Sequence, residues 1–122
     1  MKKILIVEDN SDNMDVLEAF LEDEFELLEA TDGQIGLDMA IQDKPDLILL
    51  DISLPVMDGL EVIKQIRVNK DIKDTPVIAL TAHAMLGDKE KFIEAGFNEY
   101  MSKPIVDDEL LIQMINNLLQ EK

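Results

Sequence analysis

The sequence contains no cysteine and only one histidine. Without cysteine, disulfide bonds, thiolate nucleophiles and cysteine-ligated zinc or iron–sulfur centres are excluded. A single imidazole cannot supply the several histidine ligands of a histidine-based zinc site. Any chemistry in this chain therefore depends on oxygen-bearing side chains and on amines.

Basic residues are scarce as well. The chain has 11 Lys and Arg against 27 Asp and Glu, which gives a formal net charge of -16 at pH 7. Such a chain is repelled by the phosphates of nucleic acids and by anionic lipids. We therefore expect no nucleic-acid partner and no membrane association, and a basic protein or a bound cation is the natural complement.

Long hydrophobic runs are absent too, and aromatic residues make up only 4% of the chain. No apolar run approaches the ~18 residues of a membrane-spanning helix, and no cleavable leader precedes the first apolar run. We expect a cytoplasmic protein with a mainly aliphatic core. The 122 residues fit one domain, so a single domain over 1–122 is expected.

Short apolar runs alternate with segments of helical period. Three of the runs are continuous, which is typical of parallel strands covered by helices on both faces. With two weaker runs, strands are expected at residues 4–7, 25–28, 47–50, 77–80 and 99–102. Apolar positions with helical spacing fall at residues 14–21, 35–41, 60–67, 92–95 and 110–118. This order predicts an α/β domain with a doubly wound parallel sheet and right-handed crossovers.

Functional residues of open α/β sheets collect beyond the carboxyl ends of the strands. Four of the five expected strands deliver charged or hydroxyl residues to that edge: Glu8 with Asp9, Asp51, Thr81 and Lys103. Taken singly, each has an ordinary interpretation as a cap or a solvated side chain. Together, three carboxylates with one lysine and one hydroxyl favour a functional site.

The charges of this set indicate its chemistry. Two carboxylates ~4 Å apart near a surface repel by roughly 4 kcal/mol, and one lysine leaves three of them net negative. A hard divalent cation relieves the repulsion, and Mg²⁺ suits a small set of oxygen ligands without a calcium-type loop. A carboxylate beside Mg²⁺ can attack phosphorus, which predicts phosphoryl capture by Asp51. Lys103 and Thr81 would contact the phosphoryl oxygens. The sequence has no glycine-rich nucleotide-binding motif, so the donor is not expected to be a nucleotide held in such a loop.

Five motifs carry a resemblance to the receiver domain of two-component response regulators, across essentially the whole chain. They lie at residues 4–10, 45–51, 54–59, 77–82 and 95–104. The resemblance implies a flavodoxin-like fold, with a five-stranded parallel sheet in the order 2-1-3-4-5 and five helices. It also implies that Asp51 receives its phosphoryl group from a histidine kinase or a histidine phosphotransfer protein.

The resemblance assigns roles to individual residues. Asp9 and Asp51 would ligate Mg²⁺ directly, Glu8 would act through water, and the backbone carbonyl of Ser53 would be a further ligand. The residues in contact with the phosphoryl group would be Thr81, Ala82 and Lys103.

Two further features follow from the resemblance. Ser53 and His83 would tune the lifetime of the acyl phosphate, although His83 also has an ordinary interpretation as a loop residue. The peptide bond between Lys103 and Pro104 would be cis, a rare geometry elsewhere.

A switch is also implied. Thr81 would report the phosphoryl group, and Tyr100, at the aromatic switch position of the family, would then turn inward. The face of the fourth helix, the fifth strand and the fifth helix would change shape and bind a downstream protein. In the last helix, Ile112 and Leu119 are either core residues or part of that contact surface.

The chain is expected to act as a stand-alone receiver, because it begins on the first strand and ends just after the last helix. Its motifs are most similar to receivers within, or serving, hybrid histidine kinases. A monomer or a weak dimer is expected.

Three other functions remain open from the sequence. An aspartate-nucleophile phosphatase would need a second acid at position 53, where Ser53 stands. A scaffold that is never phosphorylated would not need an intact acidic site. A flavin phosphate would be repelled by the acidic edge.

Overall fold

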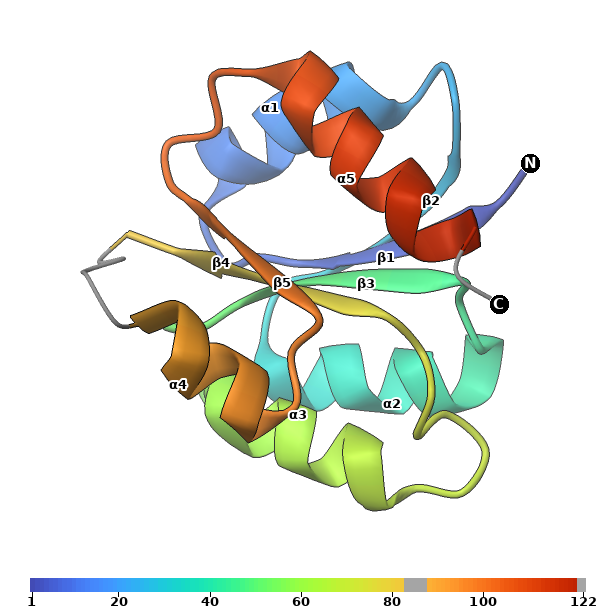
Figure 1. Ribbon diagram of the computed structural model, residues 1–122, viewed down its shortest axis with the longest axis vertical. Coiled ribbons are helices and arrows are strands. Elements are labelled where there is room, and N and C mark those ends of the chain that lie inside the picture. The colour runs from blue at the N-terminus through green and yellow to red at the C-terminus, as the bar shows by residue number, and fades with distance from the viewer. Residues whose placement is uncertain (83–87, 121–122) are drawn as a thin grey trace.

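The computed structural model describes residues 1–82 and 88–120 (Figure 1). Strands and helices alternate along this part of the chain. In order, they are β1 (Lys3–Val7), α1 (Ser11–Leu21), β2 (Glu26–Ala30), α2 (Gly33–Asp43), β3 (Leu47–Asp51), α3 (Gly59–Val68), β4 (Val77–Thr81), α4 (Asp88–Ala95), β5 (Glu99–Ser102) and α5 (Asp108–Gln120).

The strands form one parallel sheet in the order β2-β1-β3-β4-β5. Helices α1 and α5 cover one face of the sheet, and α2, α3 and α4 cover the other (Figure 1). The expected doubly wound fold and its strand order are therefore confirmed. No helix of the described residues is long and apolar enough to cross a membrane.

The continuous apolar runs form the three central strands, which are buried on both faces. Successive residues of a strand point to opposite sides of a sheet. On β1, Leu5 packs among the residues beneath α2 and α3, whereas Ile4 and Ile6 pack on the side of α1 and α5. The half-buried Ile112 and Leu119 pack against this second cluster, which favours the interpretation of both as core residues.

The boundaries of four strands differ from those expected. β1 begins one residue earlier than expected, at Lys3. β2 runs from Glu26 to Ala30 rather than over 25–28, because its ladder with β1 continues to the pair Val7–Ala30. Phe25 is buried in the core just before β2 begins. β3 and β4 each extend by one residue, so that Asp51 and Thr81 are the last residues of their strands. Both side chains are therefore held by the sheet itself.

The glycine at the start of α3 permits a close approach of two backbone segments. A Cβ atom added to Gly59 would lie 2.5 Å from the carbonyl oxygen of Asp51 and 2.8 Å from the Cα of Ile52. The amide of Gly59 donates to the carbonyl oxygen of Ile52 at 2.9 Å, and Asp58 caps the helix by accepting from the amide of Glu61. The end of β3 is thereby fixed by the first turn of α3.

Arg67, in the last turn of α3, ties together three segments of the fold. Its guanidinium donates to the carbonyl oxygens of Gly96, Lys73 and Thr75 and to Oδ1 of Asn98, at 2.7–2.9 Å. The same Asn98 oxygen accepts from the amide of Val77 at 2.9 Å. Arg67 therefore joins α3 to the chain entering β4 and to the turn between α4 and β5.

Replacement of this arginine should destabilise the protein. We expect Arg67→Met to lower the free energy of unfolding by about 3 kcal/mol, because four acceptors lose their donor, two of them in partly buried hydrogen bonds. Arg67→Lys should recover less than half of that loss, since an ammonium group lacks the planar fork of donors. Urea unfolding measures both values. A loss below ~0.5 kcal/mol, the range of ordinary surface substitutions, would show that the guanidinium is dispensable.

Acidic crowding also occurs away from the sheet edge, where α1 meets β2. A hydrogen bond with Glu18 is the main cause that raises the pKa of Glu29 to about 7. Burial and the charges of Glu18 and Asp15 raise this pKa further. Folding therefore favours the protonated form of Glu29, which is largely solvent-exposed.

This raised pKa predicts a pH dependence of stability. The contribution of Glu29 is fully present below the ordinary glutamate pKa of 4.5 and is lost as the pH rises through about 7. Glu29→Gln should therefore flatten the fall in Tm between pH 5 and pH 8. Solvent screening keeps the effect small. The matched control is Glu24→Gln at an exposed position in the turn before β2, and equal pH profiles for the two variants would contradict the prediction.

Candidate functional site

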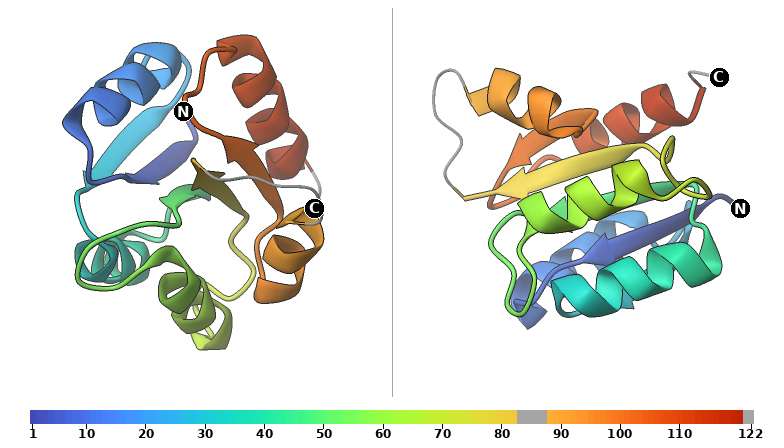
Figure 2. Two further views of the ribbon diagram at one scale, coloured as in Figure 1. Left: turned by 90° about the vertical axis from the view of Figure 1, so that its left-hand side faces the viewer. Right: turned by 90° about the horizontal axis from the view of Figure 1, so that it is seen from below.

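The strand ends gather the expected residues at one edge of the sheet. The left panel of Figure 2 looks onto the side where β3 and β4 end. β1 leads into Glu8 and Asp9, β3 ends on Asp51, β4 ends on Thr81, and β5 leads into Lys103. The amide of Lys103 donates to the carbonyl oxygen of Thr81 at 2.8 Å. Regular ladder geometry therefore sets the spacing of this group.

Three carboxylates lie together at this edge. Glu8, Asp9 and Asp51 each place one carboxylate oxygen within 4.8 Å of the others. Glu8 and Asp51 are only 1% and 3% exposed, whereas Asp9 is exposed to solvent. The predicted convergence of these three side chains is confirmed.

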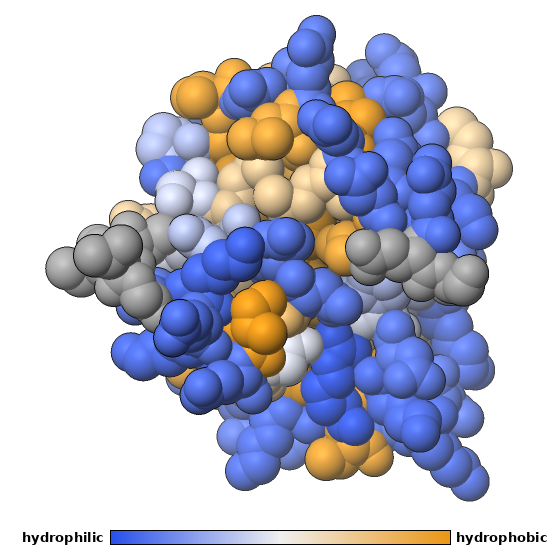
Figure 3. Space-filling model, viewed as in Figure 1, coloured by the Kyte–Doolittle hydropathy of each residue, from blue (hydrophilic) through white to orange (hydrophobic). Residues whose placement is uncertain are grey.

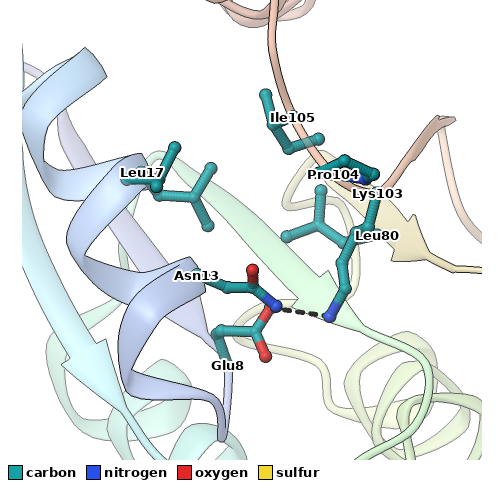
Figure 4. A pocket seen from close by; sticks show the side chains of 8 residues that line it. Glu8, Asn13, Leu17, Leu80, Lys103, Pro104 and Ile105 are labelled. Atoms are coloured by element: carbon teal, nitrogen blue, oxygen red, sulfur yellow. Dashed lines mark hydrogen bonds and ion pairs between the residues drawn. The ribbon is translucent and has the colours of Figure 1, made fainter.

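Lys103 bridges two of these carboxylates. Its Nζ lies 2.8 Å from Oε1 of Glu8 and 2.9 Å from Oδ2 of Asp51, and Figure 4 shows the lysine reaching Glu8. The other oxygens accept from backbone amides, Oε2 of Glu8 from Asn10 at 3.2 Å and Oδ1 of Asp51 from Ser53 at 3.0 Å. Every carboxylate oxygen of Glu8 and Asp51 therefore has a donor.

The protonation equilibria reflect both burial and charge. Burial raises the pKa of Glu8, and the hydrogen bonds from Lys103 and Asn10 offset only part of that effect. Burial acts to lower the pKa of Lys103, but the two carboxylates outweigh it and the pKa is raised overall. Lys103 is accordingly a stable cation beside Asp51 at neutral pH.

This donor set fits a divalent cation. One lysine beside three carboxylates leaves an excess of two negative charges, and all the available ligands are oxygens. Hard cations such as Mg²⁺ prefer such ligands and commonly keep several waters. No hydrogen bond within the described residues uses the exposed carboxylate of Asp9, so this side chain can turn toward an ion. Glu8, Asp9 and Asp51 are the carboxylates that could hold it.

The remaining residues of the predicted site are arranged around Asp51. The buried Thr81 and the exposed Ser53 share an open cavity of about 430 Å³ between α3 and α4. Ala82, which follows Thr81, is exposed. His83 lies outside the described residues, so its predicted role remains a prediction.

Tyr100 lies on β5, the strand next to β4, where it pairs with Ala79. Its half-buried ring packs against Phe92 of α4, with ring centroids 5.7 Å apart. The tyrosine therefore links β5 directly to α4. The expected cis peptide bond between Lys103 and Pro104 is confirmed.

Two features of this region were not predicted from the sequence. The ion pair between Glu8 and Lys103 joins residues 95 positions apart, and only the side-by-side strand ends reveal it. Asp88 and Lys91 of α4 line the same cavity as Thr81. The only residue that α4 buries is Phe92. Asp88 and Lys91 lie outside any apolar pattern, so the sequence could not predict that they line the cavity.

Comparison with known proteins identifies the class to which this fold and this site belong. The family described as "Response regulator receiver domain" matches residues 4–116. The chain therefore belongs to the receiver domain family of response regulators. Members of this family are signalling domains that act with a histidine kinase or a phosphotransfer protein and with downstream targets.

Individual relatives support this assignment. The polar-differentiation response regulator DivK of Brucella anthropi is 43% identical over 105 residues, which cover 85% of each protein. The receiver domain of sensor histidine kinase PA1611 from Pseudomonas aeruginosa PAO1 is 35% identical, with a TM-score of 0.88 and 97% of each chain covered. That crystal structure has a magnesium ion coordinated in the active site cleft. Chemotaxis protein CheY4 of Vibrio cholerae is 28% identical, with a TM-score of 0.88 over 97% of this chain and 98% of that one.

Proposed function

We propose that Asp51 is the phosphoryl acceptor of this receiver domain and that the donor is a phosphohistidine on a histidine kinase or a phosphotransfer protein. The observation that supports this most directly is the burial of Asp51 between Lys103 and two further carboxylates. In the reaction, a carboxylate oxygen of Asp51 forms a bond to phosphorus. The phosphorus–nitrogen bond to the donor imidazole breaks, and the released imidazole nitrogen takes up a proton. The product is an acyl phosphate.

The surrounding residues have distinct tasks in this proposal. Bound Mg²⁺ would supply positive charge to the phosphoryl oxygens. Asp9, Asp51 and the backbone carbonyl of Ser53 would hold that ion, with Glu8 contributing through water. Lys103 would contact one phosphoryl oxygen.

On the other side of Asp51, the hydroxyl of Thr81 and the backbone of Ala82 would contact further phosphoryl oxygens. Ser53 and His83 would set how fast the acyl phosphate is hydrolysed. The same groups would allow slow self-phosphorylation by small donors and slow dephosphorylation.

A turnover phosphatase is less well supported. Such an enzyme needs a second acid two residues after the nucleophile, and that position holds Ser53. The intact carboxylate cluster argues equally against a receiver that serves only as a scaffold.

Replacement of the acceptor tests the proposal. Asp51→Asn should abolish Mg²⁺-dependent labelling by phosphoramidate, because a carboxamide does not form an acyl phosphate. Phosphate-affinity electrophoresis and intact mass measure the product. Asp58→Asn is the matched control, since asparagine also caps helices, and it should label normally. Undiminished labelling of Asp51→Asn would place the acceptor elsewhere.

The surface that would carry the signal is the face of α4, β5 and α5. A groove of about 330 Å³ runs between β5 and α5, lined among others by Tyr100, Met101 and Met114. Val106 and Leu110, which also line the groove, are 83% and 50% exposed. Figure 3 shows hydrophobic side chains gathered over this part of the molecule within a mostly hydrophilic surface. A downstream protein would bind here once Thr81 and Tyr100 have moved.

Uncoupling the switch should separate phosphorylation from the conformational response. Thr81→Ala should still be labelled at Asp51, but the phosphorylation-dependent NMR shifts of Tyr100, Met101 and Leu110 should be strongly reduced. The reason is that the hydroxyl would no longer follow the phosphoryl group. Thr31→Ala, at an exposed position just after β2, is the control. Wild-type shift changes in Thr81→Ala would remove this residue from the switch.

Other expectations from the sequence remain predictions. They are a cytoplasmic location, the absence of a nucleic-acid partner, a monomeric or weakly dimeric state and a single receiver domain over residues 1–122.

A further inference from the structure

The outer edge of β2 is open. β2 ends the strand order β2-β1-β3-β4-β5, and no other strand of the described residues pairs with it on that side. The amide of Glu26 donates to the carbonyl oxygen of Lys2 at 2.9 Å, and alternate residues of a parallel strand bond to the same neighbour. The backbone N–H and C=O groups of Leu27 and Glu29 therefore point away from β1, toward the open edge.

The elements beside this edge carry charges of one sign. From residue 4 to residue 43 the sequence contains no lysine, arginine or histidine, although Asp and Glu recur throughout the stretch. Helix α1, strand β2 and helix α2 lie wholly within it. In the left panel of Figure 2, β2 lies at the rim of the sheet between these two helices. The immediate surroundings of the open edge therefore have negative side chains without positive ones among them.

Acidic side chains flank β2 on both faces of the sheet. On one face, Glu18 and Asp15 of α1 are the charges that act on Glu29. Glu26 is exposed and shares the other face with Leu28, which packs in the cluster beneath α2. A strand laid along the edge would therefore find carboxylates above and below its backbone.

We propose that the open edge of β2 binds a basic, extended segment of another protein, which adds to the sheet as a further strand. Unpaired N–H and C=O groups of an edge strand are a template for such addition. Lysine or arginine at alternate positions of the segment would lie beside Glu29, Glu18 and Asp15, so charge complementarity selects a cationic partner. This edge is opposite to β5 in the strand order, so the partner would leave the face of α4, β5 and α5 free.

A second copy of the chain is the wrong occupant for this edge. Pairing two β2 strands would bring the exposed Glu26 and Glu29 of both copies together, and like charges on neighbouring strands are destabilising. Charged side chains protect edge strands from self-association in this way. A cationic segment meets no such repulsion.

Strand addition has a backbone signature that general charge attraction lacks. The amides of Leu27 and Glu29 would gain acceptors, whereas the amide of Leu28 already faces β1 in the ladder. Hydrogen exchange at the first two positions should therefore slow, and exchange at Leu28 should change less. A peptide that is attracted only to the acidic surface would protect none of these amides selectively.

The experiment uses a short synthetic peptide of the length of β2, in which lysine alternates with threonine. At saturating peptide, we expect exchange at Leu27 and Glu29 to slow roughly tenfold or more. Glu29→Lys should weaken peptide binding about tenfold, whereas Glu94→Lys, an equal charge change at an exposed position of α4, should change it less than about twofold. NMR titration measures both affinities. The same peptide with its edge-facing amides N-methylated should give wild-type protein no protection.

Three outcomes would overturn the inference. The first is a peptide that does not bind, and the second is binding that protects neither Leu27 nor Glu29 or that both variants weaken equally. The third is protection of these amides without peptide that grows with protein concentration, since it would make a second copy the occupant. Asp51→Asn should bind the peptide as wild type does, so failure here leaves the proposed phosphoryl acceptor untouched.

Discussion

The structure depends on one electrostatic constraint, the crowding of three carboxylates around a single lysine at the edge of the sheet. Glu8 and Asp51 are almost fully buried, and the ammonium group of Lys103 lies between them. Desolvation makes buried ion pairs poor sources of stability. The arrangement is therefore better explained by what it prepares, which is a site for one more cation and for a transferred anionic group.

The fold brings these charges together by ordinary backbone geometry. Parallel pairing aligns Asp51 with Leu80 and Thr81 with Ser102, so side chains from different strands arrive at one level. The close contact between Gly59 and the backbone of Asp51 fixes the end of β3 from one side. Arg67 donates to the carbonyl oxygen of Gly96, just after the C-terminal end of α4. The ring of Tyr100 packs against Phe92 of the same helix. Asp51 thus sits in a frame that adjoins α4, which is one element of the proposed docking face.

Much of this could be predicted from the sequence, for identifiable reasons. The runs 4–7, 47–50 and 77–80 are apolar throughout because their strands are buried on both faces, and the residues that follow them had to share an edge. β2 was misplaced because Phe25 is a core residue outside the ladder, while the exposed Glu29 lies within it. The bond between Glu8 and Lys103 could not be predicted, since it depends on side-chain reach across the sheet edge. The role of Arg67 was hidden because its partners are mainly carbonyl groups, which carry no sequence signal.

Under the proposed function, the excess negative charge at this edge binds the Mg²⁺ that would prepare Asp51 to accept a phosphoryl group. The most direct test of this charge balance is the response of stability to Mg²⁺. A ligand that binds only the folded state at 100 times its Kd adds about 2.7 kcal/mol to the free energy of unfolding. Thermal unfolding of the unphosphorylated protein over a Mg²⁺ titration measures this effect. The carboxylate cluster predicts a saturable rise in Tm that is reduced in Asp9→Asn. A Tm that does not respond to Mg²⁺, or that rises equally in Asp9→Asn, would contradict it.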